Sequence, residues 1–385
     1  MGGSADRSAA SIPAQCALQP PAAGTGPRRP AKNRAMCALR YAPPFAFLAL
    51  LPLGAWLGGA WVLAPVFATP LFLTTLDAAL GDAPEGAHGA SAIAHRAAPW
   101  AYIPLQLAAI AWAAVLAARP TTSLPETIGL VLAAGFTAGI FGFVAAHEMI
   151  HSPRSAERAL GLALLAGVFY MHFRIAHVHG HHRRAATRED PATARLGESL
   201  YAFLPRSIGG QFAEAWRFEA ERLRRAGRRV LGPRNRMLVY LGLEALMALA
   251  LGLASLRALA VVIGSAIVAI ALLEAFNYIA HYGLVRRAGP GGPREAMRPQ
   301  HSWNSARRMN NWSLLNMGRH SDHHRRSTQP YQALEPLPGG AELPTGYAGA
   351  ILMALVPPLW RRVMDPRVAA VMAPEPARDD VAAAA

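Results

Sequence analysis

Residues 127–151 read TIGLVLAAGFTAGIFGFVAAHEMIH, in which an apolar run is followed by two histidines separated by three residues. The run covers residues 127–146, and a helix that crosses the hydrocarbon core of a bilayer needs about 20 such residues. His147 and His151 are four positions apart, so a helix places both side chains on one face, where they can bind one metal ion. This stretch therefore predicts a membrane-spanning helix that ends in a metal site.

The composition of the whole chain agrees with a membrane protein. Of 385 residues, 53% are hydrophobic and 16% are charged, whereas soluble domains carry about 25% charged residues. The chain has 38 Lys+Arg against 23 Asp+Glu, a net charge of +15. These basic residues lie between the apolar runs, where positive charge holds loops on the cytoplasmic side. Membrane topology thus explains the charge, and we expect no nucleic-acid partner.

The apolar runs predict an all-α integral membrane protein with six transmembrane helices in three hairpins. Residues 43–75 would form a single helix roughly 50 Å long, too long for a hydrocarbon core of about 30 Å, so we expect a hairpin that is broken around Gly58 and Gly59. The predicted spans cover, approximately, residues 44–58, 60–75, 100–118, 127–146, 237–256 and 258–280.

The segments outside the spans differ in character. Residues 1–40, rich in Arg, Pro and Ala, and residues 368–385 are predicted to be disordered, which leaves a membrane domain over residues 41–367. Residues 160–173 are too few to span and predict a buried or re-entrant segment. Residues 212–230 alternate arginines with apolar side chains and predict a helix that either lies at the membrane interface or caps the cytoplasmic domain. With the leader inside, six spans place every histidine cluster on the cytoplasmic side.

Nine of the 14 histidines fall into four clusters near predicted helix ends. A single HExxH pair, or a single histidine at a helix end, often binds no metal, but four clusters on one side of a membrane favour shared metal binding. Nine neutral imidazoles exceed the four ligands of a zinc site, so they predict a histidine-rich centre of two metals. All-nitrogen ligation suits iron, copper, zinc or nickel. The predicted ligands are His147, His151, His177, His181, His182, His281, His320, His323 and His324.

Other polar residues are predicted to support these ligands. A ligating histidine commonly donates its second ring N–H to a carboxylate, which fixes its tautomer. We expect Glu148, Asp190, Glu274 and Asp322 to accept such bonds, with His172 and His301 as further neighbours of the ligands. His88, His95 and His179 are expected to be non-ligands. Cys16 and Cys37 lie in the leader and provide no iron–sulfur ligand set.

Together these motifs resemble the membrane-bound, non-haem di-iron alkane 1-monooxygenases, or alkane hydroxylases. The resemblance covers residues 41–367, which makes it more specific than the histidine motifs alone. Its histidine motifs are HEMIH at 147–151, HVHGHH at 177–182, NYIAHYGL at 277–284 and RHSDHH at 319–324. Further matching stretches are EDPA at 189–192, LGES at 196–199, HSWNS at 301–305, YQAL at 331–334 and PPLW at 357–360.

The resemblance implies an activity, cofactors and partners. It implies two non-haem iron ions that activate O₂ and hydroxylate the terminal methyl group of an n-alkane to give a 1-alkanol. It also implies a rubredoxin, with an NAD(P)H-dependent rubredoxin reductase, as electron donor, and a place in the bacterial inner membrane, where lipids surround the protein and deliver the alkane. Three positions depart from the family: Ala176 and Ala280 stand where Glu is usual, and Ser152 where Lys is common.

Several alternatives stay open from the sequence. A fatty-acyl desaturase or hydroxylase, or a xylene-type methyl monooxygenase, would share the metal site, and a non-catalytic metal-binding or transport protein is the alternative of another class. Trp56 and Trp61 would either limit a substrate channel or face lipid, and Glu244 would be either functional or snorkelling. One set of arginines would attract either an acidic electron carrier or lipid headgroups: Arg222, Arg224, Arg225, Arg228, Arg229, Arg325 and Arg326.

Overall fold

The first apolar stretch folds as a helical hairpin. The computed structural model describes residues 38–83, 92–287 and 295–373, so the predicted disorder of residues 1–37 and 374–385 lies outside the described residues. Helix α2 (Pro43–Leu57) turns through the short 3₁₀-helix η1 (Gly59–Leu63) into α3 (Ala64–Leu80). Gly58 and Gly59 have φ angles of 75° and 55°, which glycine adopts without steric cost. The predicted break at these two glycines is confirmed.

Two more hairpins follow at the predicted places. Helix α4 (Ala92–Ala117) is followed by α5 (Leu124–Thr137), which continues through the π-helical η2 (Ala138–Gly142) into α6 (Phe143–His151). The third hairpin consists of α11 (Arg236–Ala254) and α12 (Leu256–His281). The largest differences from the predicted bounds are the start of α4, at Ala92 rather than residue 100, the end of α3, at Leu80 rather than residue 75, and the end of α6, at His151 rather than residue 146.

Five helical segments in the described part of the chain are long and apolar enough to cross a membrane: Gly59–Leu80, His95–Ala117, Leu124–His151, Arg236–Ala254 and Leu256–His281. Helix α2 is apolar but has 15 residues, fewer than the approximately 20 that a span needs. The structure therefore supports five spans by length, and the sixth stays a prediction.

Shorter elements complete the chain. They are α7 (Ser155–Gly167), α8 (Phe173–Ile175), η3 (Ala176–His181), α9 (His182–Arg184), α10 (Leu200–Arg225), η4 (Pro299–His301), β1 (Trp303–Asn304), α13 (Arg308–Ser313), α14 (His320–Arg325), η5 (Tyr331–Ala333), β2 (Ala341–Glu342), α15 (Tyr347–Ala354) and α16 (Pro357–Met372). Strands β1 and β2 pair in parallel. Because buried Val368 packs close to Gly283, α16 continues to Met372, and the predicted disorder from residue 368 is corrected for residues 368–372.

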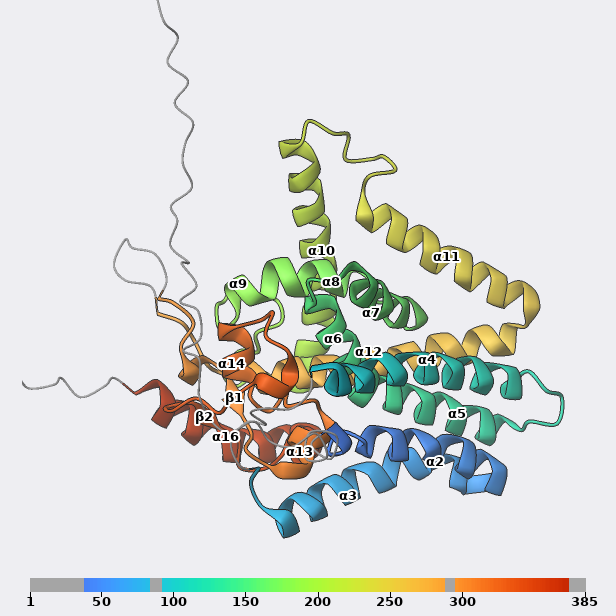
Figure 1. Ribbon diagram of the computed structural model, residues 1–385, viewed down its shortest axis with the longest axis horizontal. Helices are drawn as coiled ribbons and strands as arrows, with labels where there is room; N and C mark the ends of the chain where they lie inside the picture. Colours follow the sequence, from blue (N-terminus) through green and yellow to red (C-terminus); the bar gives the residue numbers. More distant parts are fainter. Residues whose placement is uncertain (1–37, 84–91, 288–294, 374–385) are drawn as a thin grey trace, which may run out of the picture.

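The long helices lie side by side, and the short elements gather at one end of them (Figure 1). Helix α12 packs along α5 and α4. At Gly135 the backbones of α5 and α12 approach so closely that a Cβ atom would lie 2.6 Å from the carbonyl oxygen of Ser265, and small residues permit such approach between membrane helices. Helices α6 and α12 both end in histidines, at the end where α9 and α14 lie.

The structure shows the surroundings of Trp56, Trp61 and Glu244, for each of which the sequence left two roles open. The side chains of Trp56 and Trp61 are 81% and 62% exposed, which agrees with the lipid-facing alternative. Glu244 is buried, and its Oε1 accepts a hydrogen bond of 2.9 Å from the backbone N–H of Met171. Its carboxylate therefore joins α11 to the turn that follows α7.

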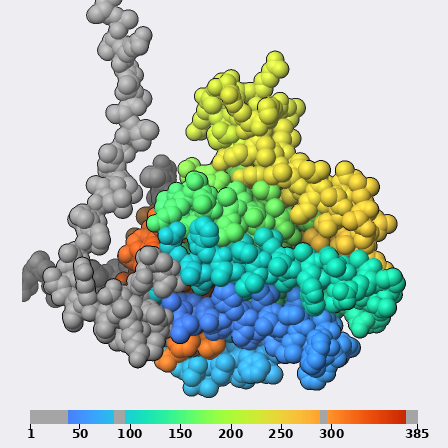
Figure 2. Space-filling model, turned by 45° about the vertical axis from the view of Figure 1, so that its right-hand side comes forward, coloured from blue at the N-terminus to red at the C-terminus, as the bar shows by residue number. Residues whose placement is uncertain are grey.

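Helix α10 extends away from the body of the molecule and forms an arm with the start of α11 (Figure 2). The helix begins at Leu200, twelve residues before the predicted interface segment, and Glu219 fixes its end. The Glu219 carboxylate accepts hydrogen bonds from the guanidinium groups of Arg222 and Arg236 and from the backbone N–H of Arg236. Burial raises the pKa of Glu219, but these donors together outweigh burial and lower the pKa to about 2.

Replacing Glu219 by Gln should lower the free energy of unfolding by about 1–3 kcal/mol at pH 7, because the hydrogen bonds from the partly exposed Arg222 and Arg236 to this buried carboxylate would become weaker bonds to a neutral amide. The pKa of Glu219 is lower in the folded protein than in an unfolded chain. The advantage of the parent protein is therefore complete above about pH 4.5 and should shrink as the pH falls toward 2. Thermal unfolding in lipid nanodiscs between pH 7 and pH 3 measures this difference.

The control is Glu221→Gln on the same helix, whose carboxylate is 52% exposed in its pair with Arg225. This exposed pair should change stability little at any pH. A Glu219→Gln protein that is as stable as the parent at pH 7 would contradict the assigned role of Glu219.

Candidate metal centre

The nine predicted histidines lie together in two groups. The five-histidine group consists of His147, His151, His177, His182 and His323, and the four-histidine group consists of His181, His281, His320 and His324. Within each group, one ring nitrogen of every histidine lies within 4.8 Å of the others. Four segments that are far apart in the sequence meet here: the ends of α6 and α12, the π-helix η3 with α9, and helix α14.

The Nε2 atoms of neighbouring rings converge within each group. The distances are 2.8 Å between His147 and His177 and 3.1 Å between His151 and His182 in the five-histidine group. In the four-histidine group, His324 Nε2 lies 3.1 Å from the Nε2 atoms of both His281 and His320. Imidazoles bound at about 2.0–2.1 Å on one ion would have adjacent nitrogens about 3 Å apart, so the spacing fits metal ligation.

His181 gives a second test of the fit. Its Nδ1 bonds Asp190 at a distance of 2.8 Å, and its buried Nε2 atom has no hydrogen-bond partner among the described residues. A buried polar atom without a partner is costly and needs an explanation. A metal ion in the four-histidine group would supply that partner.

A turn of π-helix divides the histidines of the HVHGHH motif, residues 177–182, between the two groups. In η3 the backbone N–H of His182 bonds the carbonyl of His177, five residues earlier. This wider turn places His177 and His182 in one group and turns His181 toward the other. By α-helical spacing, His177 and His181, four positions apart, are predicted to bind the same ion. The π turn corrects this prediction, because the two histidines belong to different groups. A π turn adds one residue to an α-helical turn and is frequent at functional sites.

The other clusters keep α-helical spacing. His147 and His151 are one turn apart on α6 and belong to the same group, as the sequence predicts. On α14, His320 and His324 belong to the four-histidine group, while His323 belongs to the five-histidine group. Both η3 and α14 thus contribute to both groups and fix the position of one group relative to the other.

The surroundings of the rings favour their neutral form. Burial lowers the pKa of five of the histidines in the two groups well below the usual value, and nearby imidazoles lower it further. These five are His177, His182, His320, His323 and His324. The neutral imidazole is the form that ligates metal. The site is therefore prepared for metal at neutral pH without first losing protons.

An apolar cavity of about 750 Å³ reaches both groups. It lies between α3, α5, α12 and α15, and it reaches His147 and His177 of the five-histidine group and His320 of the four-histidine group. Phe67, Leu71 and Leu355 line it as well, and they are also exposed at the surface, by 68%, 62% and 45%. The cavity therefore extends from the lipid-facing surface to the histidines.

Comparison with known proteins agrees with this geometry. Residues 121–339 match the family model described as fatty acid desaturase. The chain is 38% identical over 343 residues to alkane 1-monooxygenase 2 of Pseudomonas aeruginosa, with 84% of this chain and 90% of that protein covered. It is 41% identical over 277 residues to alkane 1-monooxygenase 1 of the same organism, with 71% and 72% covered. The chain belongs to the alkane 1-monooxygenase family, within the wider fatty acid desaturase family.

A third relative, the alkane 1-monooxygenase of Acinetobacter baylyi, is 38% identical over 268 residues, with 69% of this chain and 65% of that protein covered. Together with the five candidate spans, membership of the alkane 1-monooxygenase family makes the chain an oxidoreductase integral to a membrane. Its histidine groups can hold metal.

Of the four carboxylates that were predicted to accept a ring N–H from a ligand histidine, Asp190 accepts one, from His181. Glu148 instead accepts the backbone N–H of Tyr331 at 3.2 Å. Asp322 binds the guanidinium groups of Arg325 and Arg326. The prediction for Glu148 and Asp322 is therefore corrected: each is adjacent to a ligand in the sequence, but on its helix it points toward a neighbouring loop or a surface arginine.

Glu274 is also corrected. It is fully buried and accepts hydrogen bonds from Tyr170 Oη at 3.0 Å, Ser207 Oγ at 2.6 Å and Gln211 Nε2 at 2.8 Å. It therefore joins α12 to α10 rather than to a ligand histidine. These donors come from segments more than 60 positions away in the sequence, which is why local spacing misassigned this carboxylate.

The two remaining predicted neighbours differ from each other. His172 packs its ring against Tyr170 and Phe212, with centroid distances of 4.4 and 5.1 Å, and burial lowers its pKa to about 4. His172 is thus an aromatic packing residue. His301 does support a ligand, but through its backbone: His281 Nδ1 donates to the His301 carbonyl at 2.9 Å. His179 lies in neither group.

The aromatic residues at the metal end of the cavity were missed. Phe143 and Phe173 line the cavity and each precedes a ligand, His147 or His177, by four residues. A helical residue four positions from another lies on the same face. The spacing that identified the ligands could therefore also have identified the side chains beside them.

Replacing Gly180 by Ala should lower both metal content and activity, because the added Cβ atom must displace either η3 or the buried side chain of Glu214, which pairs with Arg184. A Cβ atom at Gly180 would lie 2.9 Å from Phe218 Cε2 and would overlap the carboxylate of Glu214 on α10. The histidines at 177–182 would then move relative to those on α14. Metal analysis of the purified variant measures the change.

The matched control is Gly209→Ala on α10, where a Cβ atom would meet nothing within 4 Å. This variant should keep its metal and its activity. A Gly180→Ala protein with the metal content of the parent would contradict the claim that close packing of η3 on α10 positions the ligands.

Proposed function

We propose that the chain hydroxylates the terminal methyl group of medium- and long-chain n-alkanes to 1-alkanols at a centre of two non-haem irons. The observation that carries the proposal is the apolar cavity, which extends from the lipid-facing surface to histidines of both groups. The relatives at 38–41% identity are named alkane 1-monooxygenases. An alkane is apolar and dissolves in the bilayer, so it can enter an apolar cavity from the lipid and reach the histidines without passing through water.

The nine histidines would hold the irons, one in each group, through their Nε2 atoms. Nitrogen ligation without thiolates suits iron. When bound, the irons supply O₂ activation: one oxygen atom enters the alcohol and the other leaves as water, with two electrons and two protons consumed. The chain's own contribution is to hold the rings neutral and converged and to separate the site from bulk water.

Rigid aromatic side chains would select the end of the alkane. Phe173 stacks on His177 with a centroid distance of 4.8 Å, and Phe276 stacks on Tyr347 at 4.0 Å. These rings line the cavity beside the histidines and cannot move aside without disturbing a ligand or a buried neighbour. A chain that enters with its end first would therefore present a methyl group to the metals.

The electrons would come from rubredoxin, which an NAD(P)H-dependent rubredoxin reductase reduces. Figure 1 places α9 and α14 together and the tip of α10 away from them. Arg325 and Arg326 directly follow the ligands of α14 and remain partly exposed, so a small acidic carrier docked there would be close to the histidines. The arginines at the tip of α10, which include Arg225, would contact lipid headgroups instead.

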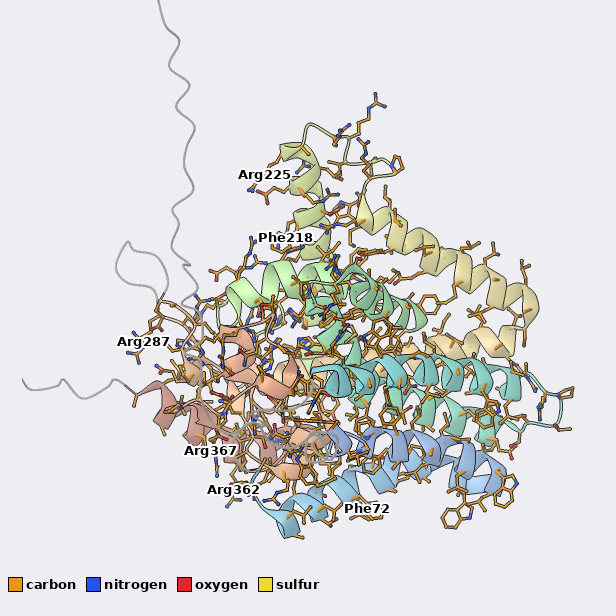
Figure 3. All side chains as sticks on the ribbon, in the orientation of Figure 1. Phe72, Phe218, Arg225, Arg287, Arg362 and Arg367 are labelled. Atoms are coloured by element: carbon orange, nitrogen blue, oxygen red, sulfur yellow. The ribbon has the colours of Figure 1, made fainter. Side chains whose placement is uncertain are left out.

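The proposed orientation is that of a bacterial inner-membrane protein with its metal centre on the cytoplasmic side. Arg287, Arg362 and Arg367 lie at the end that carries the histidines, whereas Phe72 lies on the outside of α3 (Figure 3). Positive charge favours the cytoplasmic face. In this arrangement α2 is the sixth span, and the membrane domain, predicted over residues 41–367, extends to Met372 at the end of α16.

The direct test supplies purified protein with rubredoxin, reductase, NADH, O₂ and n-alkanes of several lengths. We expect 1-alkanols, detected by gas chromatography. His181→Ala and His323→Ala, one from each group, should each lower the rate at least about 100-fold and reduce bound iron, because each removes a proposed ligand.

The control is His179→Ala, which changes the same motif but belongs to neither group and should keep activity and iron. Iron-loaded parent protein that forms product from acyl chains or xylenes, but none from alkanes, would contradict the proposed substrate. Full activity in either ligand variant would contradict the ligand assignment.

A second test concerns the cavity. Leu272→Trp places a larger side chain in its wall and should lower kcat/KM for the longest accepted alkane at least about tenfold relative to the shortest. Leu249→Trp on α11 is the control, because this leucine is exposed and lies outside the cavity lining; its chain-length profile should match the parent. An unchanged profile in Leu272→Trp would show that the cavity does not hold the substrate.

A further inference from the structure

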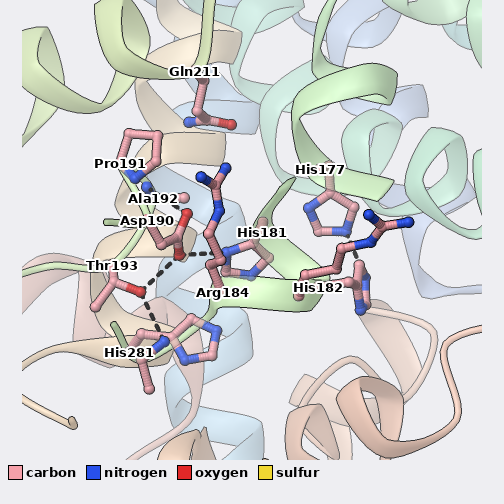
Figure 4. Close-up of polar contacts among 12 residues, drawn as sticks. His177, His181, His182, Arg184, Asp190, Pro191, Ala192, Thr193, Gln211 and His281 are labelled. Atoms are coloured by element: carbon pink, nitrogen blue, oxygen red, sulfur yellow. Dashed lines mark hydrogen bonds and ion pairs between the residues drawn. The ribbon is translucent and has the colours of Figure 1, made fainter. Parts of the chain in front are cut away.

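Asp190 lies in the loop between α9 and α10 and is 1% exposed. Its Oδ2 accepts hydrogen bonds from His181 Nδ1 at 2.8 Å and from Thr193 Oγ1 at 2.7 Å (Figure 4). Its Oδ1 accepts the backbone N–H of Ala192 at 3.1 Å. Both oxygens are thus occupied, and the carboxylate has a fixed direction.

The loop that carries Asp190 is itself tied down on two sides. Thr193 Oγ1 accepts the backbone N–H of Ala186 at 2.9 Å, which connects the loop to the residues after α9. The carbonyl of Ala194 accepts the backbone N–H of Gly283 at 3.0 Å, two residues after the ligand His281. Asp190 is therefore positioned relative to η3 and to the end of α12, both of which contribute to the four-histidine group.

His181 stands between the two groups. Its ring centroid lies 4.9 Å from those of His281 and His324 in its own group and 5.1 Å from that of His177 in the other. The π turn directs the His181 side chain toward the four-histidine group, but the ring has imidazole neighbours on both sides and its orientation needs a further contact. The bond from Nδ1 to Asp190 fixes the tautomer and directs Nε2 into the four-histidine group.

The two groups differ in such support. In the four-histidine group, His181 and His281 donate their Nδ1 protons to Asp190 and to the carbonyl of His301. The buried Nδ1 atoms of His320 and His324 in the same group have no hydrogen-bond partner within the described ranges, and neither do those of His147 and His182 in the five-histidine group. Two of the four rings in the four-histidine group are therefore oriented by an Nδ1 hydrogen bond, whereas among the described residues none of the five rings in the other group is. Bonds of this kind orient a ligand and raise its basicity, and losing one typically costs about 10–100-fold in metal affinity.

We propose that Asp190 is a positioning residue that makes the two metal sites unequal, so that the four-histidine group binds its ion more tightly and fills first. This inference rests on the proposed function for the presence of two irons. It concerns the order of filling, which the activity by itself does not reveal. The five-histidine group, with more ligands but fewer oriented ones, fills second and loses its ion first to a chelator.

The first measurement needs no variant. Metal-free parent protein receives one equivalent of ⁵⁷Fe(II) without oxygen, and then a second, with a Mössbauer spectrum after each addition. We expect one dominant quadrupole doublet after the first addition and a second doublet only after the second. In His281→Ala the first doublet should be lost, and in His151→Ala it should remain. Two equal doublets after the first addition, or the reverse pattern in the variants, would overturn the proposal.

The second measurement isolates Asp190. Asp190→Asn keeps the size of the side chain and should weaken the first binding step about 10–100-fold. The two sites should then fill together, and both doublets should appear after the first addition of iron. Thr193→Val, which removes one donor to the carboxylate, should weaken the same step less. Glu274→Gln is the matched control: another buried carboxylate becomes an amide, but one that contacts no ligand, so the order of filling should persist.

The outcomes separate the two proposals. If Asp190→Asn does not fold, Thr193→Val and the parent titration still decide. A preserved order of filling in both Asp190→Asn and Thr193→Val would overturn the role of Asp190 while the parent still bound two irons and produced 1-alkanols. A parent protein that bound fewer than two irons, or produced no alkanol, would overturn the proposed function instead.

Discussion

The convergence of nine imidazoles in two groups is the constraint on which the rest of the structure depends. Each buried nitrogen without a partner costs about 1–3 kcal/mol, yet Nε2 atoms here approach one another to 2.8–3.3 Å. The surrounding helices must hold this arrangement. Some of the ligands lie at the ends of the long apolar helices α6 and α12. The short helices η3 and α14 contribute ligands to both groups.

The position of this constraint joins two environments. The apolar cavity reaches the histidines from the lipid-facing side, while arginines and the short elements surround them at the polar end of the bundle. A substrate dissolved in lipid and electrons delivered through water can therefore meet at one place. The same argument explains why buried Glu274 and Glu219 join α10 to α12 and α11: they stabilise the helices that support η3.

Much of this architecture could be predicted because it depends on local patterns. The lengths of the apolar runs predicted the long helices, and Gly58 and Gly59 predicted the turn of the first hairpin. Eight of the nine histidines that meet were found by their spacing, and His281 was found by its position at a predicted helix end on the same side as the other clusters. The π turn was not predictable, since a shift from four- to five-residue hydrogen bonding leaves no mark in residue types. The partners of Glu274 lie on another helix, and the short length of α2 conceals whether it crosses the bilayer.

The most direct test is iron K-edge X-ray absorption on the purified protein, combined with metal analysis. The account predicts two irons per chain and a first coordination shell dominated by nitrogen, with the outer-shell scattering that imidazole rings produce. One iron per chain, a shell with sulfur, or a shell made mainly of oxygen would contradict it, because the nine convergent histidines would then not be the ligands.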